Sequence, residues 1–242
     1  MRVLPTPADV ISSHPDPLLR WSSQSLRPGR GGAAWAHGDA VAVWAPGLYR
    51  RDRLVLAGPP ADVAVLLREH DRPGARPLMT AELAGELAAE LDRPLLGVFG
   101  WMERTGSVDA PPDGARWLAE DEWGEVEALL RRANPDSWAW PGEPRTTRWA
   151  GLRAEDGALA AVAADAWSTP GVGFIAGVAT DPVHRGRSLS TRVCAFVAGA
   201  LLAEHGTCAL MVDAGNRAAV GVYRRLGFAY RSVGVLGDAG HS

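Results

Sequence analysis

The segment from Val178 to Thr191 combines small, polar and basic residues in an order that suits an anion site, Val-Ala-Thr-Asp-Pro-Val-His-Arg-Gly-Arg-Ser-Leu-Ser-Thr. The pattern predicts a strand, a tight turn and the first turn of a helix. Small residues let the backbone approach a ligand closely, and the unpaired N–H groups at a helix start suit a pyrophosphate. Arg185 and Arg187 add guanidinium groups, each of which can bind two phosphate oxygens at once. A solvated turn with an ordinary helix cap is the alternative interpretation.

A second segment places two polar side chains on one face of a predicted helix. Asn216 and Tyr223 are seven residues apart, which is about two turns of a helix with 3.6 residues per turn, so both side chains can point into one cleft. Gly227 stands where a helix ends in the left-handed conformation, and Phe228 returns the chain to the sheet. A tyrosine that only packs in the core is the alternative for Tyr223.

Together the two segments resemble the GNAT superfamily of acyl-CoA-dependent N-acyltransferases. The cofactor signature of that family, Gln/Arg-x-x-Gly-x-Gly/Ala, is matched in position by the residues from Arg185 to Ser190. The downstream signature Asn-x-x-Ala-x-x-x-Tyr-x-x-Leu-Gly-Phe is matched completely from Asn216 to Phe228. The resemblance extends over about residues 115–236, and the pattern around Trp149 looks most like the glycine N-acyltransferase-like branch.

The resemblance implies an N-acetyltransferase that transfers an acetyl or short acyl group from acyl-CoA to a primary amine of a small molecule or peptide. Acetyl-CoA or another short acyl-CoA would be the co-substrate, and the amine would attack the thioester directly. Tyr223 would donate a proton to the departing thiolate, which makes it the catalytic residue. Backbone groups of the strand would pair with the pantetheine arm, and amides of the turn would hold the pyrophosphate. The implied cofactor-binding residues are Val178, Ala179, Thr180, Arg185, Gly186, Arg187, Ser188, Leu189, Ser190, Thr191 and Asn216.

Two positions depart from the family pattern. Ser188 and Ser190 stand where the cofactor signature has Gly and Gly or Ala. A serine in a left-handed conformation, or in contact with phosphate, introduces strain or a clash, but serine is small and can donate its hydroxyl to phosphate. We therefore expect the site to be kept, and the alternative is a catalytically degenerate acyl-CoA-binding sensor or scaffold.

The residue that removes the proton from the amine is left open by the sequence. Asp165, Asp181 and His184 are candidates by location, but each also suits an ordinary structural position at a strand end or in a turn. Deprotonation through water is an equal alternative. Trp138 and Trp140 lie in a proline-broken segment, where they could wall an apolar or aromatic acceptor pocket.

The order of the predicted elements indicates an α/β (α+β) fold with a GNAT-like mixed central sheet flanked by helices, and a smaller N-terminal α+β lobe. A Pro-Pro-Asp-Gly break at residues 111–114 predicts the domain boundary. Residues 1–112 would form the N-terminal lobe, for which a degenerate GNAT-like half is one interpretation, and residues 113–242 the GNAT-like N-acetyltransferase domain. In the first half, strands are expected at 33–35, 40–44, 54–57 and, buried, at 95–101, with helices from residue 59 and at 80–91. In the second half, strands are expected at 115–118, 149–153, 158–165, 172–180, 207–212 and 228–236, with helices at 121–133, 189–204 and 217–226.

Composition excludes several other classes of protein. All 25 basic residues are arginine, so neither a Schiff-base lysine nor a phosphate-loop lysine is available. A net charge of −3 and a pI of about 6.1 argue against nucleic acid as a partner. Cys194 and Cys208 have no Cys-x-x-Cys spacing and no histidine cluster nearby, which argues against a disulfide framework and a metal site, and Cys194 reads as a small core residue.

Further expectations concern location and rival ligands. No apolar run suits a membrane span or a signal peptide, so we expect a cytoplasmic protein without a membrane partner, and a homodimer is left open. A dinucleotide site is the rival enzyme class, but Gly-x-Gly-x-x-Gly is absent. The first half lacks a second phosphate signature, because Pro59 and Pro60 carry no N–H donors.

Overall fold

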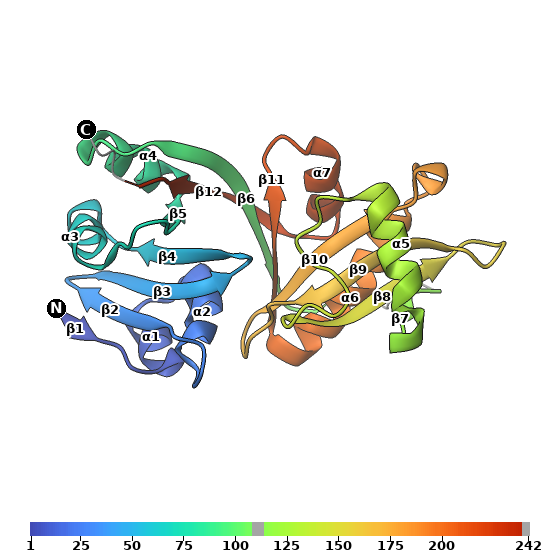
Figure 1. The fold of residues 1–242 in the computed structure, drawn as a ribbon, viewed down its shortest axis with the longest axis horizontal. Coiled ribbons are helices and arrows are strands. Elements are labelled where there is room, and N and C mark those ends of the chain that lie inside the picture. Colours follow the sequence, from blue (N-terminus) through green and yellow to red (C-terminus); the bar gives the residue numbers. More distant parts are fainter. Residues whose placement is uncertain (108–113, 239–242) are drawn as a thin grey trace. The chain divides into compact units, whose positions relative to one another are not determined.

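The computed structural model describes residues 1–107 and 114–238 (Figure 1). These residues form two compact units, one of Met1–Trp101 together with the C-terminal segment from Arg231, and the other of Met102–Tyr230. The predicted boundary at residues 111–114 falls almost entirely on residues 108–113, outside the described part of the chain, and stays a prediction. The expected α+β class, with a mixed sheet flanked by helices, is confirmed.

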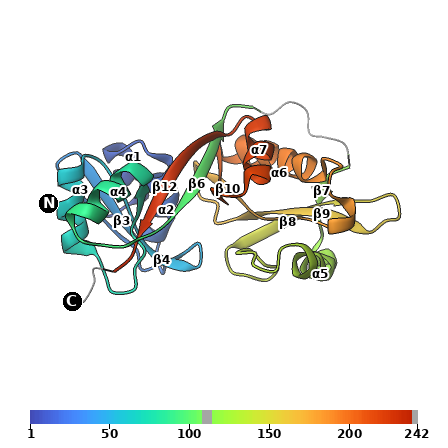
Figure 2. The same cartoon turned by 90° about the horizontal axis from the view of Figure 1, so that it is seen from above.

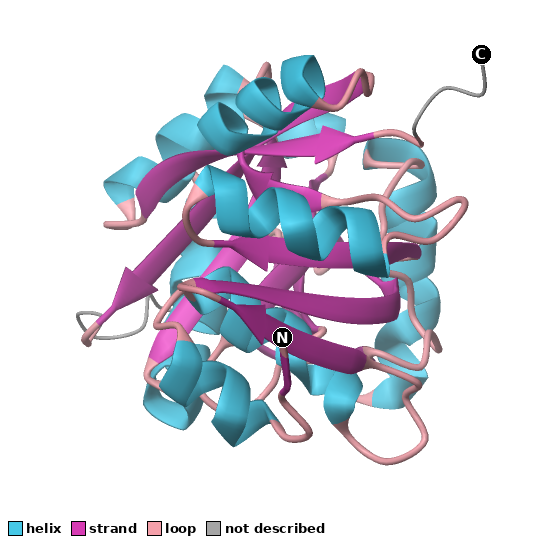
Figure 3. Ribbon diagram, turned by 90° about the vertical axis from the view of Figure 1, so that its left-hand side faces the viewer, coloured by secondary structure: helices cyan, strands magenta, loops and turns pink. Residues whose placement is uncertain are grey.

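The first unit has helices on both faces of its strands (Figure 3). Its strands lie in the order β1-β2-β3-β4-β5-β12, with β4 and β5 parallel and β5 antiparallel to β12. Its elements are β1 (Arg2–Val3), α1 (Pro7–Ser13), α2 (Pro17–Ser22), a 3-10 turn (Ser23–Leu26), β2 (Ala33–His37), β3 (Ala40–Leu48), β4 (Arg51–Ala57), α3 (Pro60–His70), β5 (Leu78–Thr80), α4 (Ala81–Glu90) and the start of β6 (Leu95–Thr105).

The second unit carries α5 on one face of its sheet and α6 and α7 on the other (Figure 2). Its strand order is β6-β11-β10-β9-β8-β7, in which β10 and β11 are parallel and β7 to β10 form an antiparallel meander. Its elements are β7 (Arg116–Trp117), a 3-10 turn (Glu120–Glu122), α5 (Trp123–Ala133), β8 (Thr146–Arg153), β9 (Leu159–Ala166), β10 (Gly173–Thr180), a 3-10 turn (Pro182–His184), α6 (Leu189–His205), β11 (Thr207–Asp213), α7 (Arg217–Arg225) and β12 (Ala229–Leu236).

The two units repeat one order of elements. Each has a short strand, a helical segment, three antiparallel strands, a helix, a strand parallel to the third of those, another helix and a final strand; the helical segment holds α1 and α2 in the first unit and α5 in the second. The final strands are exchanged along the chain, because β12 pairs with β5 and β6 lies beside β11. Residues from Arg231 onwards therefore complete the first unit, where Arg231 forms a double ion pair with Asp16 at 2.6 and 2.7 Å.

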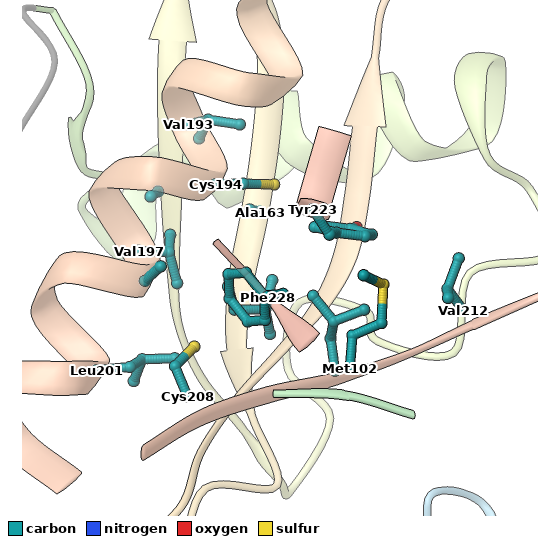
Figure 4. Packing of buried hydrophobic residues seen from close by; sticks show 14 of the residues in the cluster. Met102, Ala163, Val193, Cys194, Val197, Leu201, Cys208, Val212, Tyr223 and Phe228 are labelled. Carbon is teal, nitrogen blue, oxygen red and sulfur yellow. The ribbon is translucent and has the colours of Figure 1, made fainter. Parts of the chain in front are cut away.

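The core of the second unit is built from α6, α7 and the inner strands. Apolar positions on α6, including Val197 and Leu201, are fully buried against the sheet, and Phe228 closes the core after α7 (Figure 4). This spacing follows the 3.6-residue period of a helix, which explains why the sequence predicted α6 to within one residue at its end.

Two features of the first unit differ from expectation. The strand predicted at 95–101 is present as the start of β6, but Leu95, Leu96, Val98 and Phe99 are 38–50% exposed rather than buried. Helices α1 and α2 and the short strands β1 and β5 were not predicted, although Thr6 and Asp9 form a capping box before α1. Among the described residues, no helix has the length and apolar character that crossing a membrane requires.

Candidate active site

A pocket of about 350 Å³ lies within the second unit, where the ends of α5 and β10 meet the starts of α6 and α7. Seven of the predicted site residues line it, namely Val178, Ala179, Thr180, Arg185, Ser190, Asn216 and Tyr223. The structure thus brings the two sequence segments together around one cavity. The other predicted residues, Gly186, Arg187, Ser188, Leu189 and Thr191, belong to the adjoining turn and the first turn of α6.

A β-bulge in β10 shapes the wall of this pocket. Between Ala176 and Ala179, β10 has one residue more than the facing part of β9. Gly177 adopts a left-handed conformation with φ of +61°, and an added Cβ would lie 2.8 Å from Cζ3 of the buried Trp149 and still nearer to its Cη2. Only glycine meets both demands, so Trp149 on β8 fixes the bulge and hence the course of the backbone that follows.

The strands β10 and β11 pair only over a short length. Their register runs from Gly173 opposite Cys208 to Ile175 opposite Leu210, although β10 continues to Thr180. The backbone of the last part of β10 therefore faces the pocket instead of β11, in the way that an added extended ligand requires. Figure 1 shows the two strands diverging toward this end.

The turn after β10 holds the helix start at the pocket. Asp181 accepts a hydrogen bond from the N–H of Val183 and forms an ion pair with Arg132 at 2.9 Å. Gly186 has φ of +80°, and Ser188 takes the left-handed conformation with φ of +57° without a side-chain capping bond. The strain expected for a serine at this signature position is thus present at Ser188.

The second unusual serine is not strained in this way. Ser190 lies in the first turn of α6, where the backbone is helical, and its side chain lines the pocket. The first N–H groups of a helix have no partner inside the helix, so those of α6 point toward the turn and the pocket end as donors for an anion. The exposed Arg185 lies beside them and donates to the carbonyl oxygen of Ala133 at 3.4 Å.

Tyr223 packs deeply in the pocket wall and is 7% exposed. Its ring stands edge-on to Phe228, with 6.0 Å between the centroids, and it is hydrogen-bonded to Cys194 of α6. Burial raises the pKa of the Cys194 thiol to about 12, and the contact with Tyr223 offsets this only in part. Cys194 is therefore a neutral core thiol, as the sequence analysis expected, and Figure 4 shows it on the same side of the core as Tyr223.

Asn216 has a structural task as well as a place in the pocket. It caps α7, because its side-chain oxygen accepts a hydrogen bond from the N–H of Ala219 at 3.0 Å. The cap holds the first turn of α7 beside the cavity, and the adjacent Ala218 and Ala219 contribute small side chains that leave room for a ligand.

None of the three base candidates lines the pocket. Asp165 is buried, and its carboxylate accepts hydrogen bonds from Nε of Arg148, at 3.1 Å, and from the hydroxyl of Ser168. The bonds from Arg132 and the N–H of Val183 lower the pKa of Asp181. Among the described residues that line this pocket, the only ionisable side chains are those of Arg185 and Tyr223.

Sequence reasoning missed one polar wall of the pocket. Asn134, the residue after α5, lines it and donates from Nδ2 to the carbonyl oxygen of Val178 at 3.2 Å. At the end of β10, the buried hydroxyl of Thr180 has no hydrogen-bond partner in the described part of the chain. Trp138 and Trp140, expected near the acceptor, are not among the residues lining this cavity. An asparagine at a helix end was the available signal for Asn134.

The comparisons with known proteins agree with this geometry. Residues 113–228 match the model of the Acetyltransferase (GNAT) family. Over this segment the chain is similar to that family. A comparison with curated proteins found no match. The glycine N-acyltransferase-like branch stays a prediction.

Solved structures of the GNAT family share the fold. A GCN5-related N-acetyltransferase from Kribbella flavida is 22% identical with a TM-score of 0.57, over 86% of this chain and 89% of that chain. A GCN5-related N-acetyltransferase from Sphaerobacter thermophilus is 20% identical with a TM-score of 0.55, over 81% and 79%. A GNAT-family acetyltransferase from Colwellia psychrerythraea is 12% identical with a TM-score of 0.51, over 86% of each chain. At these identities the likeness concerns the fold alone.

Proposed function

We propose that this protein transfers an acetyl or short acyl group from acyl-CoA to a primary amine of a small molecule or peptide. The observation that carries the proposal is the meeting of three features at one pocket of the second unit. These are the helix start beside Arg185, the end of β10, which pairs with β9 but not with β11, and the buried Tyr223.

The residues of the pocket suit the parts of an acyl-CoA. The N–H groups at the start of α6 and the guanidinium of Arg185 would bind the pyrophosphate, because both present donors and positive charge. The backbone from Val178 to Thr180 would bond the amides of the pantetheine arm as a neighbouring strand does. The buried, unpartnered hydroxyl of Thr180 is a polar group that gains a partner when a ligand lies there.

The proposed chemistry is direct attack of a neutral amine on the thioester. The amine nitrogen forms the new C–N bond, the C–S bond breaks, and Tyr223 gives its hydroxyl proton to the departing sulfur. No carboxylate or imidazole lines the pocket in the described part of the chain, so in this proposal the amine passes its proton to water.

The first test measures binding. Acetyl-CoA at 100 times its dissociation constant should stabilise the protein by roughly 2.7 kcal/mol, or about 5 to 10 °C in melting temperature. Arg185→Ala should weaken binding by about ten- to a hundredfold, whereas Arg131→Ala, which removes an exposed arginine of α5 outside the pocket, should not. A melting curve unmoved by millimolar acetyl-CoA but shifted by NADH would refute the proposal.

The second test separates an enzyme from an acyl-CoA sensor or scaffold. Tyr223→Phe keeps the ring that packs on Phe228 and removes only the hydroxyl, so acyl-CoA affinity should stay within a few fold while turnover falls about 10²-fold. Release of free thiol, followed with a panel of amines, measures turnover. Binding of acyl-CoA without transfer to any amine of the panel would favour the sensor.

A further inference from the structure

The first unit contains a pocket of its own, of about 520 Å³, which lies within the range of small-molecule sites. It is bounded by β1, the end of α1, the turn between β2 and β3, and the junction of β4 with α3. The argument for a ligand rests on the charged and polar side chains that line it, namely Arg2, Ser13, His14 and Asp39.

This pocket occupies a place in the first unit that resembles the place of the acyl-CoA pocket in the second. In the repeated order of elements, β4 corresponds to β10, and α1 lies between the first two strands of its unit as α5 does in the second. Each pocket uses the end of that helix and the end of that strand. The chemistry differs, because Pro59 and Pro60 stand at the start of α3 and supply no N–H donors. A pyrophosphate is therefore not the ligand that this pocket suits.

Two glycines fix the walls of the pocket. Gly58 has φ of +135°, and an added Cβ would lie 2.5 Å from Cα of Ala40. Gly38 has φ of +53°, and an added Cβ would lie 2.5 Å from Cγ of Asp62. The Asp62 carboxylate also accepts the backbone N–H of Asp39 at 3.1 Å. The turn that carries Asp39 is thus held against α3 by close backbone packing and a hydrogen bond.

The pocket has a positively charged side. Arg2 donates to the hydroxyl oxygen of Ser13 at 3.0 Å and has no carboxylate partner among the described residues. Asp16, two residues after His14, does not line the pocket, and both terminal nitrogens of Arg231 bind its carboxylate. His14 accepts the N–H of Asp16 at its Nδ1, so the neutral ring carries its proton on Nε2, where it can donate to an anion.

The pocket also has a negatively charged group. The Asp39 carboxylate makes no hydrogen bond or ion pair within residues 1–107 and 114–238. Arg2 and Asp39 therefore offer opposite, unneutralised charges to the same cavity. A ligand with one charge would leave the other without a partner, whereas a ligand with both charges satisfies each of them.

We propose that this pocket binds a small zwitterion of the amino acid type, with its carboxylate on Arg2 and His14 and its ammonium group on Asp39. Binding involves no covalent step. The site belongs to the first unit alone and does not depend on the acyl-transfer function proposed above.

The test uses the full chain and a panel of free amino acids, with binding measured by calorimetry and by amide NMR shifts near Ser13, Gly38 and Gly58. For the amino acid that binds best, its carboxamide and its N-acetyl derivative each remove one charge. Each should bind about ten- to a hundredfold more weakly. Because these analogues are tested on the unaltered protein, the outcome does not depend on the folding of a variant.

Charge-neutral variants then assign each charge to a residue. Arg2→Gln should lose the preference for the free acid over its carboxamide, and Asp39→Asn the preference for the free amine over its N-acetyl derivative. Arg30→Gln removes another exposed arginine of the first unit, away from the pocket, and should change neither preference. Acetyl-CoA affinity should be unchanged in all three variants.

Several results would overturn the proposal. These are the absence of binding by any amino acid at millimolar concentration, equal binding of the blocked analogues, or preferences that survive in both Arg2→Gln and Asp39→Asn. Acetyl-CoA binding is measured in the same samples, so a protein that binds acetyl-CoA but no amino acid refutes this site and leaves the acyltransferase proposal standing.

Discussion

Gly177→Ala should destabilise the second unit because the bulge of β10 has no room for a side chain. The residue has φ of +61°, and its new Cβ would press on the far edge of the Trp149 ring, which is fully buried and cannot turn away. A left-handed conformation costs a residue with a Cβ about 1–2 kcal/mol, and overpacking a core adds about 1–3 kcal/mol. The expected loss in free energy of unfolding is therefore about 2–5 kcal/mol.

Gly157→Ala provides the matched control. Gly157 lies in the turn between β8 and β9 with φ of +85°, but nothing lies within 4 Å of an added Cβ. This variant carries only the conformational cost, about 1–2 kcal/mol. Urea denaturation followed by tryptophan fluorescence measures both variants, and acetyl-CoA affinity reports whether the displaced bulge disturbs the site.

A double-mutant cycle isolates the contact itself. Trp149→Phe removes the outer ring atoms that the new Cβ would meet, so Gly177→Ala should cost about as much in that background as Gly157→Ala costs in the parent. Equal costs for Gly177→Ala and Gly157→Ala in the parent protein, or no coupling to Trp149, would show that the ring does not hold the bulge.

Three further predictions concern strain, charge and thiol reactivity. Ser188→Gly should raise the free energy of unfolding by about 1 kcal/mol in urea denaturation, because the relief of a left-handed serine exceeds the extra entropy of glycine in the unfolded chain. Burial would raise the pKa of Asp16, but Arg231 and the N–H of Leu18 outweigh it and hold that pKa below 3.8. The stabilisation from Asp16 is thus present above the ordinary carboxyl pKa and is lost as the pH falls through the lowered pKa of the folded protein. Asp16→Asn should therefore flatten this part of a plot of unfolding free energy against pH. An unchanged acid profile would show that Asp16 does not supply this stabilisation. Burial raises the pKa of both cysteine thiols, so iodoacetamide at pH 8 should label neither in the folded protein and both in urea, as mass spectrometry would show; rapid labelling of the native chain would count against their burial.

Local patterns were sufficient for most elements of the second unit. The apolar positions of α5 at Val126, Leu129 and Leu130 are all buried, because their spacing places them on one helix face whatever the sheet beneath. The glycine after α7 and the asparagine before it mark the ends of that helix through bonds to near neighbours in the chain.

The pocket was only partly predictable, because some of its lining residues are held by partners that are distant in the sequence. The resemblance supplied seven of its lining residues, but Asn134 is tied to Val178 across 44 positions of sequence, and no local pattern specifies that bond. The three base candidates were chosen by proximity in sequence. Asp181 and Asp165 are bonded to arginines of other elements, and none of the three, His184 included, lines the pocket.

The sequence by itself determined the helix and strand order of the second unit, the turn before α6 and the family signatures, because these depend on residues a few positions apart. Tertiary structure decided which surfaces those elements meet. Trp149 on β8 makes glycine necessary at Gly177, and pairing with β5 assigns the end of β12 to the first unit. Such contacts join residues distant in sequence, and a strand pattern indicates which side chains are buried but not which strand will receive its hydrogen bonds.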